Sequence, residues 1–200
     1  IKERRSIRKY QDREIPEEVL KEILEHALWA PSGTNRQAWE IYVLKGKIKE
    51  ELVQVIAQSG EYMNPRLEKL YPEKIARATL QFFKNLGGAP VVLLVYVPKI
   101  EYEISPEMTG LEKHKNEHER FNYLLSASAL IQNILLLAQT RGLGTCWMTG
   151  PKYVEEQINE FMAIKNQELV SIIPVGYPDQ SPSAPRRKGE KIHWIGFDES

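Results

Sequence analysis

The sequence predicts one α+β domain built of packed layers of helices and strands. Two uninterrupted apolar runs, residues 89–97 and 169–175, are rich in β-branched residues and are typical of strands buried on both faces. A third stretch, residues 121–140, is apolar on nearly every side and predicts a central helix. These elements do not follow the regular strand–helix–strand order of a doubly wound parallel sheet, so we expect an α+β layered fold.

The N-terminal half predicts a helix, a strand and a second helix. Pro16 followed by two glutamates is a typical helix start, and Pro31 and Gly33 end that helix in a loop. Residues 39–44 have strand character, and residues 48–57 are amphipathic and helical. Residues 59–73 contain Gly60 and two prolines, so we expect them to belong to a mobile helical flap.

The C-terminal half predicts a polar, exposed insertion at about residues 100–119 before the central helix. Gly142 and Gly144 close that helix, residues 145–148 are extended, and residues 154–162 form a short helix. From residue 179 the chain is proline-rich and basic, with few core residues. A buried central helix beside such a tail predicts that two chains complete one core between them.

Composition excludes several classes of function. The chain of 200 residues fits a single domain, and its 27 basic residues balance its 27 acidic ones, so no nucleic-acid partner is expected. Cys146 is the single cysteine, and the interrupted apolar runs predict no membrane span. We therefore expect a soluble, cytoplasmic protein. His114 and His118 share a helix face but have no evident third ligand, so no metal site is expected.

Three polar clusters could carry chemistry. Arg4, Ser6 and Arg8 would share one face of an extended segment and could hold one phosphate, although on spacing alone a solvated basic N-terminus explains them better. Residues 31–37 offer Asn35 and Gln37 to the edge of a planar heterocycle, or form an ordinary polar loop.

The glycines at 142 and 144 form a poor dinucleotide-binding motif. They lack a third glycine and follow a helix instead of a strand, so a helix C-cap explains them better. A third basic group, Arg186-Arg187-Lys188, lies in the tail, and in isolation a solvated tail explains it well.

These clusters together resemble the nitroreductase family. The likeness is collinear from about residue 4 to residue 188 and rests on four segments: RRSIRKY at 4–10, APSGTNRQAW at 30–39, IQN at 131–133 leading to GLGTCWM at 142–148, and PVGYP at 174–178. Ala38 departs from the family, which commonly has proline before Trp39. The resemblance implies a three-layer sandwich with a mostly antiparallel central sheet and a buried core helix. It also implies an intertwined homodimer with two FMN molecules at the interface.

The resemblance further implies a role for each cluster. Arg4, Arg5, Ser6 and Arg8 would bind the FMN phosphate and ribityl chain, and Arg187, with Arg186, would return to the phosphate from the tail. The flavin would be lined by Pro31, Ser32, Gly33, Asn35 and Gln37, the last two from either subunit, and by Met148, Thr149 and Gly150 beside flavin N5. In this reading NAD(P)H or another donor delivers hydride to N5, leaves, and is replaced by a small acceptor such as a nitroaromatic or a quinone.

Two alternatives remain open. Glu61-Tyr62-Met63 is similar to the iodotyrosine deiodinase branch, in which a flap Glu, Tyr and Lys bind the substrate zwitterion and a threonine hydroxyl faces N5. Thr149 and Tyr62 match by position, Lys84 only after a shift of one residue, and the Glu position falls at Gln58. The second alternative is a non-catalytic flavin-binding sensor. By position in the family, the flap at about residues 59–84 selects the substrate.

Overall fold

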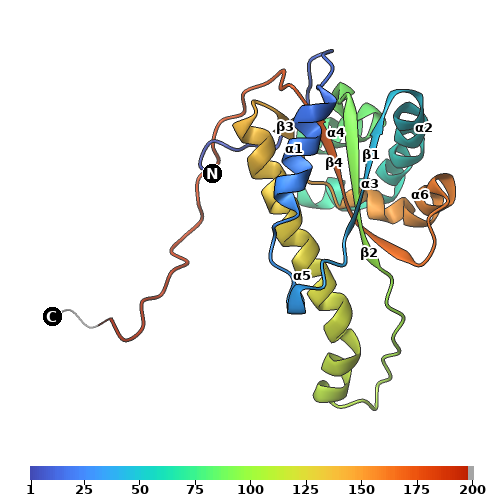
Figure 1. The fold of residues 1–200 in the computed structure, drawn as a ribbon, viewed down its shortest axis with the longest axis vertical. Coiled ribbons are helices and arrows are strands. Elements are labelled where there is room, and N and C mark those ends of the chain that lie inside the picture. The colour runs from blue at the N-terminus through green and yellow to red at the C-terminus, as the bar shows by residue number, and fades with distance from the viewer. Residues whose placement is uncertain (198–200) are drawn as a thin grey trace.

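The computed structural model, which describes residues 1–197, contains one antiparallel sheet of four strands in the order β1-β2-β4-β3. These strands are β1 (Glu40–Lys45), β2 (Val91–Pro98), β3 (Gly144–Thr145) and β4 (Gln167–Gly176). The two apolar runs of the sequence form β2 and β4, which pair at the centre of the sheet (Figure 1). A register shift between Val95 and Tyr96 bulges β4 at this pairing.

Helices cover both faces of the sheet, so the molecule has three layers (Figure 1). Along β2, Val91, Leu93 and Val95 face one core, whereas Val92, Leu94 and Tyr96 face the other. The first core is closed by α1 (Glu17–Ala27) and α5 (Gly110–Thr140), the second mainly by α2 (Gly46–Ala57), α4 (Glu73–Asn85) and α6 (Glu155–Met162). The α+β sandwich expected from the sequence is confirmed.

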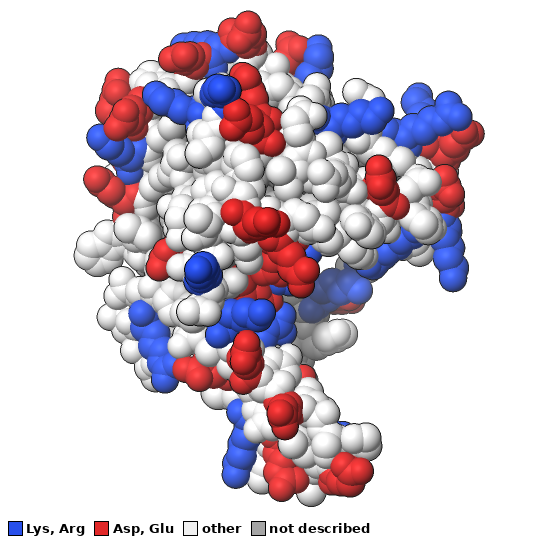
Figure 2. Space-filling model, turned by 90° about the vertical axis from the view of Figure 1, so that its right-hand side faces the viewer, with Lys and Arg blue, Asp and Glu red and all other residues white. Residues whose placement is uncertain are grey.

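The central helix α5 begins at Gly110, well before the predicted start at residue 121. The Thr109 side chain accepts from the Glu112 backbone N–H, while the Glu112 carboxylate accepts from the Thr109 backbone, which makes a complete capping box. The first turns of α5 project from the body as a narrow arm, seen at the bottom of Figure 2. Polar on every side, this arm has no hydrophobic periodicity from which a helix could be predicted.

By length and composition alone, α5 is long and apolar enough to cross a membrane. In this fold it is a core helix instead, because Ala127, Leu130, Ile131 and Ile134 are buried against the sheet. Its opposite side is open in the single chain: Phe121 and Leu125 are each more than half exposed. One chain therefore covers only one side of its own core helix.

The expected flap forms two helices, α3 (Ser59–Leu70) and α4. They pack on each other, and α3 also packs on the 3-10 turn Gly150–Val154. Shorter 3-10 turns lie at Gly33–Asn35 and Leu86–Gly88. After α5, Gly142 takes a left-handed conformation and the Leu143 N–H donates to the carbonyl of Ala138, as a helix C-cap requires.

Charges are interspersed over the face shown in Figure 2, where lysines and arginines alternate with carboxylates. This face carries no broad basic field of the kind that attracts nucleic acid.

Candidate active site

The arginine-rich N-terminal segment lies against the end of β3. Ser6 forms a parallel bridge with Thr145, and the Ile7 N–H donates to the Thr145 carbonyl at 2.9 Å. Gly144 permits this approach, because a Cβ at that position would lie 2.6 Å from Cγ1 of Ile7. The segment therefore runs beside residues 144–148, and two clusters that are far apart in sequence lie side by side.

Two arginines of this segment, Arg4 and Arg8, lie close enough to Cys146 for their charges to act on its thiol. Burial raises the pKa of the Cys146 thiol, while the positive charges of Arg8 and Arg4 oppose that rise. Arg5 donates from Nη1 to the carbonyls of Lys2 and Arg4, but its buried Nε has no partner among residues 1–197. Two cations, Arg4 and Arg8, and the Ser6 hydroxyl in the same segment as the unpartnered Arg5 Nε fit a phosphate group, whose oxygens accept bidentate hydrogen bonds.

Thr149 and Gly150 stand where the extended segment leaves the sheet. Met148 exchanges two backbone hydrogen bonds of 3.0 Å with Ile172, and the Ser171 hydroxyl donates to the Met148 carbonyl at 3.0 Å. Thr149 is therefore held at the sheet edge with its side chain exposed. Gly150 touches the second helical layer, because a Cβ there would lie 2.5 Å from Sδ of Met63.

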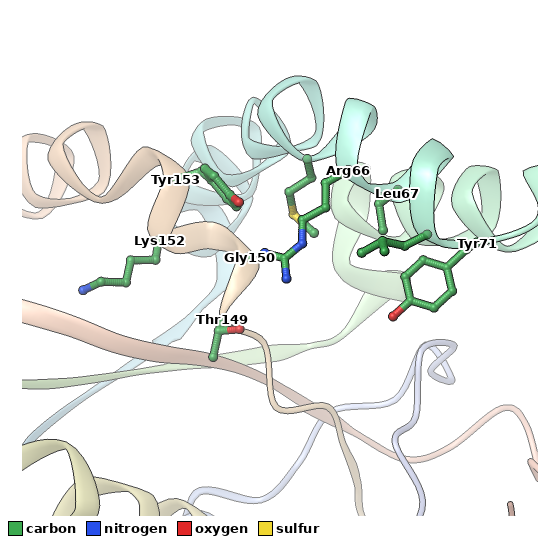
Figure 3. Close-up of a pocket in the computed structure, with 9 residues that line it drawn as sticks. Arg66, Leu67, Tyr71, Thr149, Gly150, Lys152 and Tyr153 are labelled. Carbon is green, nitrogen blue, oxygen red and sulfur yellow. The ribbon is translucent and has the colours of Figure 1, made fainter.

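A cavity of about 630 Å³ opens beside Thr149 and Gly150 (Figure 3). Its apolar wall comes from one face of α3, Met63, Leu67 and Leu70. The other lining residues are polar: Arg66, Tyr71, Lys152 and Tyr153. No carboxylate of the described residues 1–197 lines this cavity.

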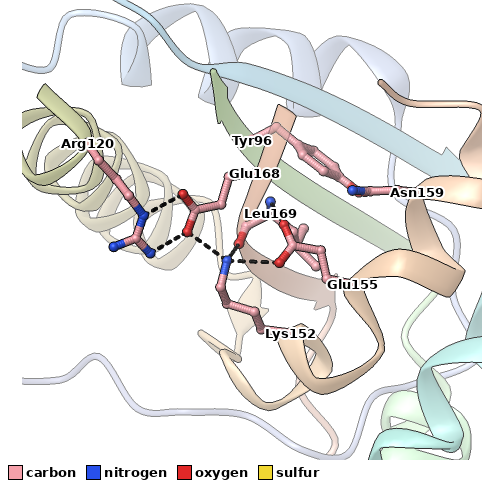
Figure 4. Close-up of polar contacts among 7 residues, drawn as sticks. All are labelled: Tyr96, Arg120, Lys152, Glu155, Asn159, Glu168 and Leu169. Carbon is pink, nitrogen blue, oxygen red and sulfur yellow. Dashed lines mark hydrogen bonds and ion pairs between the residues drawn. The ribbon is translucent and has the colours of Figure 1, made fainter. Parts of the chain in front are cut away.

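An ion-pair network fixes the segment that follows Thr149 (Figure 4). Glu168 of β4 accepts two hydrogen bonds from Arg120, at 2.6 and 2.8 Å, and one from Lys152 at 2.8 Å. Lys152 also pairs with Glu155 at 3.0 Å and donates to the Leu169 carbonyl at 3.0 Å. The network thereby ties the arm of α5 to β4 and to the Gly150–Val154 turn.

Glu168 is the most enclosed member of this network, with a side chain only 9% exposed. Burial alone would raise its pKa, but the hydrogen bonds from Arg120 and Lys152 outweigh that effect and hold the pKa below its ordinary value. Glu168 is therefore ionised at neutral pH.

The predicted loop at residues 31–37 lies elsewhere in the single chain, against the middle of α5. The Gly33 N–H donates to Ser126 Oγ at 3.2 Å, and the Gln37 side chain donates to Asn35 Oδ1 at 3.1 Å. Ser32 and Gly33 line a separate hollow of about 290 Å³, whereas Pro31 is exposed. Three residues, Thr34, Asn35 and Gln37, have positive φ values of 48° to 55°, a strain that often marks a binding loop.

Four further predicted residues lie outside the Thr149 cavity. Tyr62 is 57% exposed, and Lys84 lines a different hollow together with Glu61 and Asn64. Arg186 and Arg187 lie in the extended tail, and within residues 1–197 Arg187 donates only to the carbonyl of Pro185. Within one chain, the Arg4–Arg8 segment and residues 148–150 therefore lie together. The loop at residues 31–37, the two tail arginines, and Tyr62 and Lys84 of the flap do not join them.

Sequence reasoning missed Arg66 and Tyr71, and it also missed the Arg120–Glu168 pair. The spacing of Met63, Leu67 and Leu70 is helical and marks the α3 face that turns toward Gly150, so it was the available signal for Arg66. No local pattern joins Arg120 to Glu168, because their contact depends on how α5 crosses β4.

Comparison with known proteins agrees with this geometry. The profile of the nitroreductase family matches residues 1–177. A Bacillus subtilis protein named as an NAD(P)H nitroreductase is 31% identical over 190 residues, covering 94% of this chain and 87% of the relative. An iodotyrosine deiodinase of Hydra vulgaris is 26% identical over 195 residues, covering 96% and 68%.

A solved structure gives the same fold. A Desulfovibrio desulfuricans protein in complex with FMN superposes with a TM-score of 0.66 at 23% identity, covering 93% of this chain and 88% of that one. The family profile includes the arginine segment, Thr149 and all four strands. This chain belongs to the nitroreductase family.

Proposed function

We propose that this FMN-dependent oxidoreductase uses NAD(P)H to reduce a small acceptor, a nitroaromatic or a quinone, in a homodimer. The observation that carries the proposal is the pairing of the Arg4–Arg8 segment with residues 145–150. This pairing supports the proposal because it sets a cluster of arginines, suited to a phosphate, near an exposed hydroxyl and a cavity large enough for an aromatic substrate.

The residues present fit FMN. Arg4, Ser6 and Arg8 would hold its phosphate, with the open Nε of Arg5 as a further donor. Met148, Thr149 and Gly150 would line the reactive edge of its ring system, and the Thr149 hydroxyl would offer a hydrogen bond there. When bound, FMN supplies the hydride and electron transfer that amino-acid side chains cannot.

The remaining predicted residues would join the site in the dimer. The loop with Pro31, Ser32, Gly33, Asn35 and Gln37 would come from the partner, and Arg186 with Arg187 would reach the phosphate as the tail wraps back. The open side of α5, which exposes Phe121 and Leu125, would form the interface. The tail exposes Ile192, Trp194 and Ile195, which would also be covered there.

The chain itself binds and orients the two reactants. Donor and acceptor would enter the same opening in turn. Among the described residues, the cavity beside Thr149 is what gives access to the reactive edge of the bound FMN. For a nitro group the balance is R–NO₂ + NAD(P)H + H⁺ → R–NO + NAD(P)⁺ + H₂O. In the part of the chain that the structure describes, no carboxylate or histidine lines the cavity, so the proton would come from solvent through its open side.

The placement of Tyr62 and Lys84 outside this cavity does not favour halotyrosine as the acceptor. We also propose that the protein acts in the cytoplasm, where a buried, unpaired thiol such as that of Cys146 stays reduced.

The purified protein is expected to be yellow, with one FMN per chain, and to lose flavin absorbance when NADH or NADPH is added without oxygen. Nitrobenzene or a quinone should restore the absorbance. Arg4→Ala should weaken FMN binding about tenfold, because it removes a charge-assisted contact to phosphate. The exposed Lys2→Ala is the matched control and should change little.

A protein that takes up no FMN would overturn the proposal. Stoichiometric FMN with no turnover of any acceptor would point to a flavin-binding sensor. Tight halotyrosine binding with rapid dehalogenation and slow NAD(P)H oxidation would point to a deiodinase.

A further inference from the structure

Arg66 is placed to bind an anionic group of whatever occupies the cavity. Its side chain leaves α3 and reaches toward Thr149 and Gly150, as Figure 3 shows. No hydrogen bond or ion pair engages its guanidinium within residues 1–197. The residues three and four positions away on α3 are Tyr62, Met63, Lys69 and Leu70, so the helix offers no acid to neutralise it.

The second cation of the cavity is already neutralised. The Lys152 ammonium contacts Glu155, Glu168 and the Leu169 carbonyl, and its chain turns away from Arg66 in Figure 3. Among residues 1–197, Arg66 therefore carries a positive charge without a carboxylate partner, in a cavity lined by no carboxylate of that range. Such a guanidinium favours an anion with two oxygens, which accepts from it bidentately.

The surroundings of Arg66 indicate what else the ligand carries. Met63, Leu67 and Leu70 form an apolar wall on the same helix face, which suits a flat aromatic ring. The Tyr71 hydroxyl points into the same space in Figure 3 and can share the polar end of a ligand. The opposite side of the space is bounded by Thr149 and Gly150.

We propose that Arg66 selects aromatic acceptors that bear a carboxylate, binding the carboxylate while the ring lies between the α3 wall and Thr149. This inference rests on the proposed function, since it names the class of acceptor for the same site. A nitrobenzoate is the simplest molecule that meets these requirements.

Two probe pairs test the inference on the FMN-loaded protein. The first pair, benzoate and benzyl alcohol, is not reduced, so its binding is measured by calorimetry without turnover. The second pair, 4-nitrobenzoate and nitrobenzene, is compared by kcat/KM. Arg66→Gln should raise the Kd of benzoate and lower kcat/KM for 4-nitrobenzoate, each about tenfold, and leave benzyl alcohol and nitrobenzene within twofold.

Matched variants separate this role from general charge. Lys69→Gln removes the same charge from an exposed position of the same helix, outside the cavity, and should leave all four probes unchanged. Arg66→Lys should recover part of the discrimination, because it keeps the charge but loses the bidentate geometry.

Equal losses with nitrobenzene and 4-nitrobenzoate would overturn the inference, because they would show a structural effect. A loss confined to the NADPH reaction, with NADH and both acceptors unaffected, would overturn it as well, since Arg66 would then bind the cofactor phosphate. If the wild type reduces neither a nitro compound nor a quinone, the proposed function fails, while benzoate binding still decides the role of Arg66.

Discussion

At the scale of single residues, Gly87 holds the Arg4–Arg8 segment in place. Its φ is +67°, and a Cβ there would lie 2.2 Å from the carbonyl oxygen of Arg8. The Gly87 carbonyl also accepts from the Tyr10 N–H at 3.0 Å. The backbone of Arg8 can therefore pass only because residue 87 has no side chain.

Gly87→Ala is expected to lower the free energy of unfolding by on the order of 3 kcal/mol, because left-handed strain adds to a backbone clash. It should also weaken FMN binding, since the clash moves Arg8. Urea unfolding and flavin fluorescence measure the two effects.

Gly88→Ala is the matched control for this variant. Its φ is +76°, yet nothing lies within 4 Å of the added Cβ. It should cost only the left-handed strain, about 1 kcal/mol, and leave FMN binding unchanged. Equal effects of the two variants on FMN would contradict a link between Gly87 and the Arg8 segment.

Much of the candidate site could be predicted from the sequence, because its residues stand next to one another along the chain. The Arg4–Arg8 segment combines arginines with a serine, and Thr149 is followed directly by Gly150. What could not be predicted was which of these residues meet in one chain. Ser6 contacts Thr145 through a sheet bridge, whereas Ser32 lines a hollow that residues of α5 also line, and only the packed fold decides this. Arg66 was missed because its position at the cavity depends on which face of α3 turns toward Gly150.

At the scale of elements, the Arg120–Glu168–Lys152 network fastens the arm of α5 and the turn after Thr149 to the sheet (Figure 4). Arg120 and Lys152 are 32% and 38% exposed, so solvent weakens both pairs. Glu168→Gln should still lower the free energy of unfolding by about 2 kcal/mol at pH 7, because it leaves two half-buried cations without their carboxylate.

The pH dependence of this effect has a defined sign. The folded pKa of Glu168 lies below its ordinary value of 4.5, so its contribution is fully present above 4.5 and is lost as pH falls through the folded pKa. The difference between wild type and Glu168→Gln should therefore shrink in urea melts taken below pH 4.5.

Glu73→Gln is the matched control, because Glu73 and Arg77 form a fully surface pair with side chains 75% and 79% exposed. It should change stability by less than about 0.5 kcal/mol at any pH. Amide exchange in residues 150–154 should accelerate in Glu168→Gln alone. Unchanged exchange there would show that the network does not position this turn.

Elements with a strong local signal were predicted well. Strands β2 and β4 are continuous apolar runs, and α1 has a proline and acids at its start. The arm of α5 could not be predicted in this way, since solvent surrounds it and the Thr109–Glu112 capping box is its main local mark.

At the scale of the whole molecule, the sequence indicated the layers but not the strand order. Nothing in the local pattern of β3, which has two residues, says that it pairs with β4 at the sheet edge. That pairing depends on where α5 ends and on the N-terminal segment that follows the same edge.

The open side of α5 makes the proposed dimer testable. Leu125 is 53% exposed one helical turn from Phe121, which is 55% exposed, and the two side chains form an exposed apolar stripe on α5. Leu125→Glu places a charge in the proposed interface, where an unpaired carboxylate is costly to bury. The dimer dissociation constant should rise at least about 100-fold, and light scattering should find the mass of a single chain, 23.1 kDa, where the wild type has twice that mass.

Loss of the dimer should also release FMN, because the loop around Ser32 and Asn35 would no longer reach the Arg4–Arg8 segment of the other chain. Ile48→Glu is the matched control: Ile48 is 51% exposed but lies on α2, in the opposite layer. It should leave both mass and flavin content unchanged. If the wild-type protein instead binds FMN as a monomer, the complete site lies in one chain. The proposal that the exposed stripe on α5 forms a dimer interface would then be wrong.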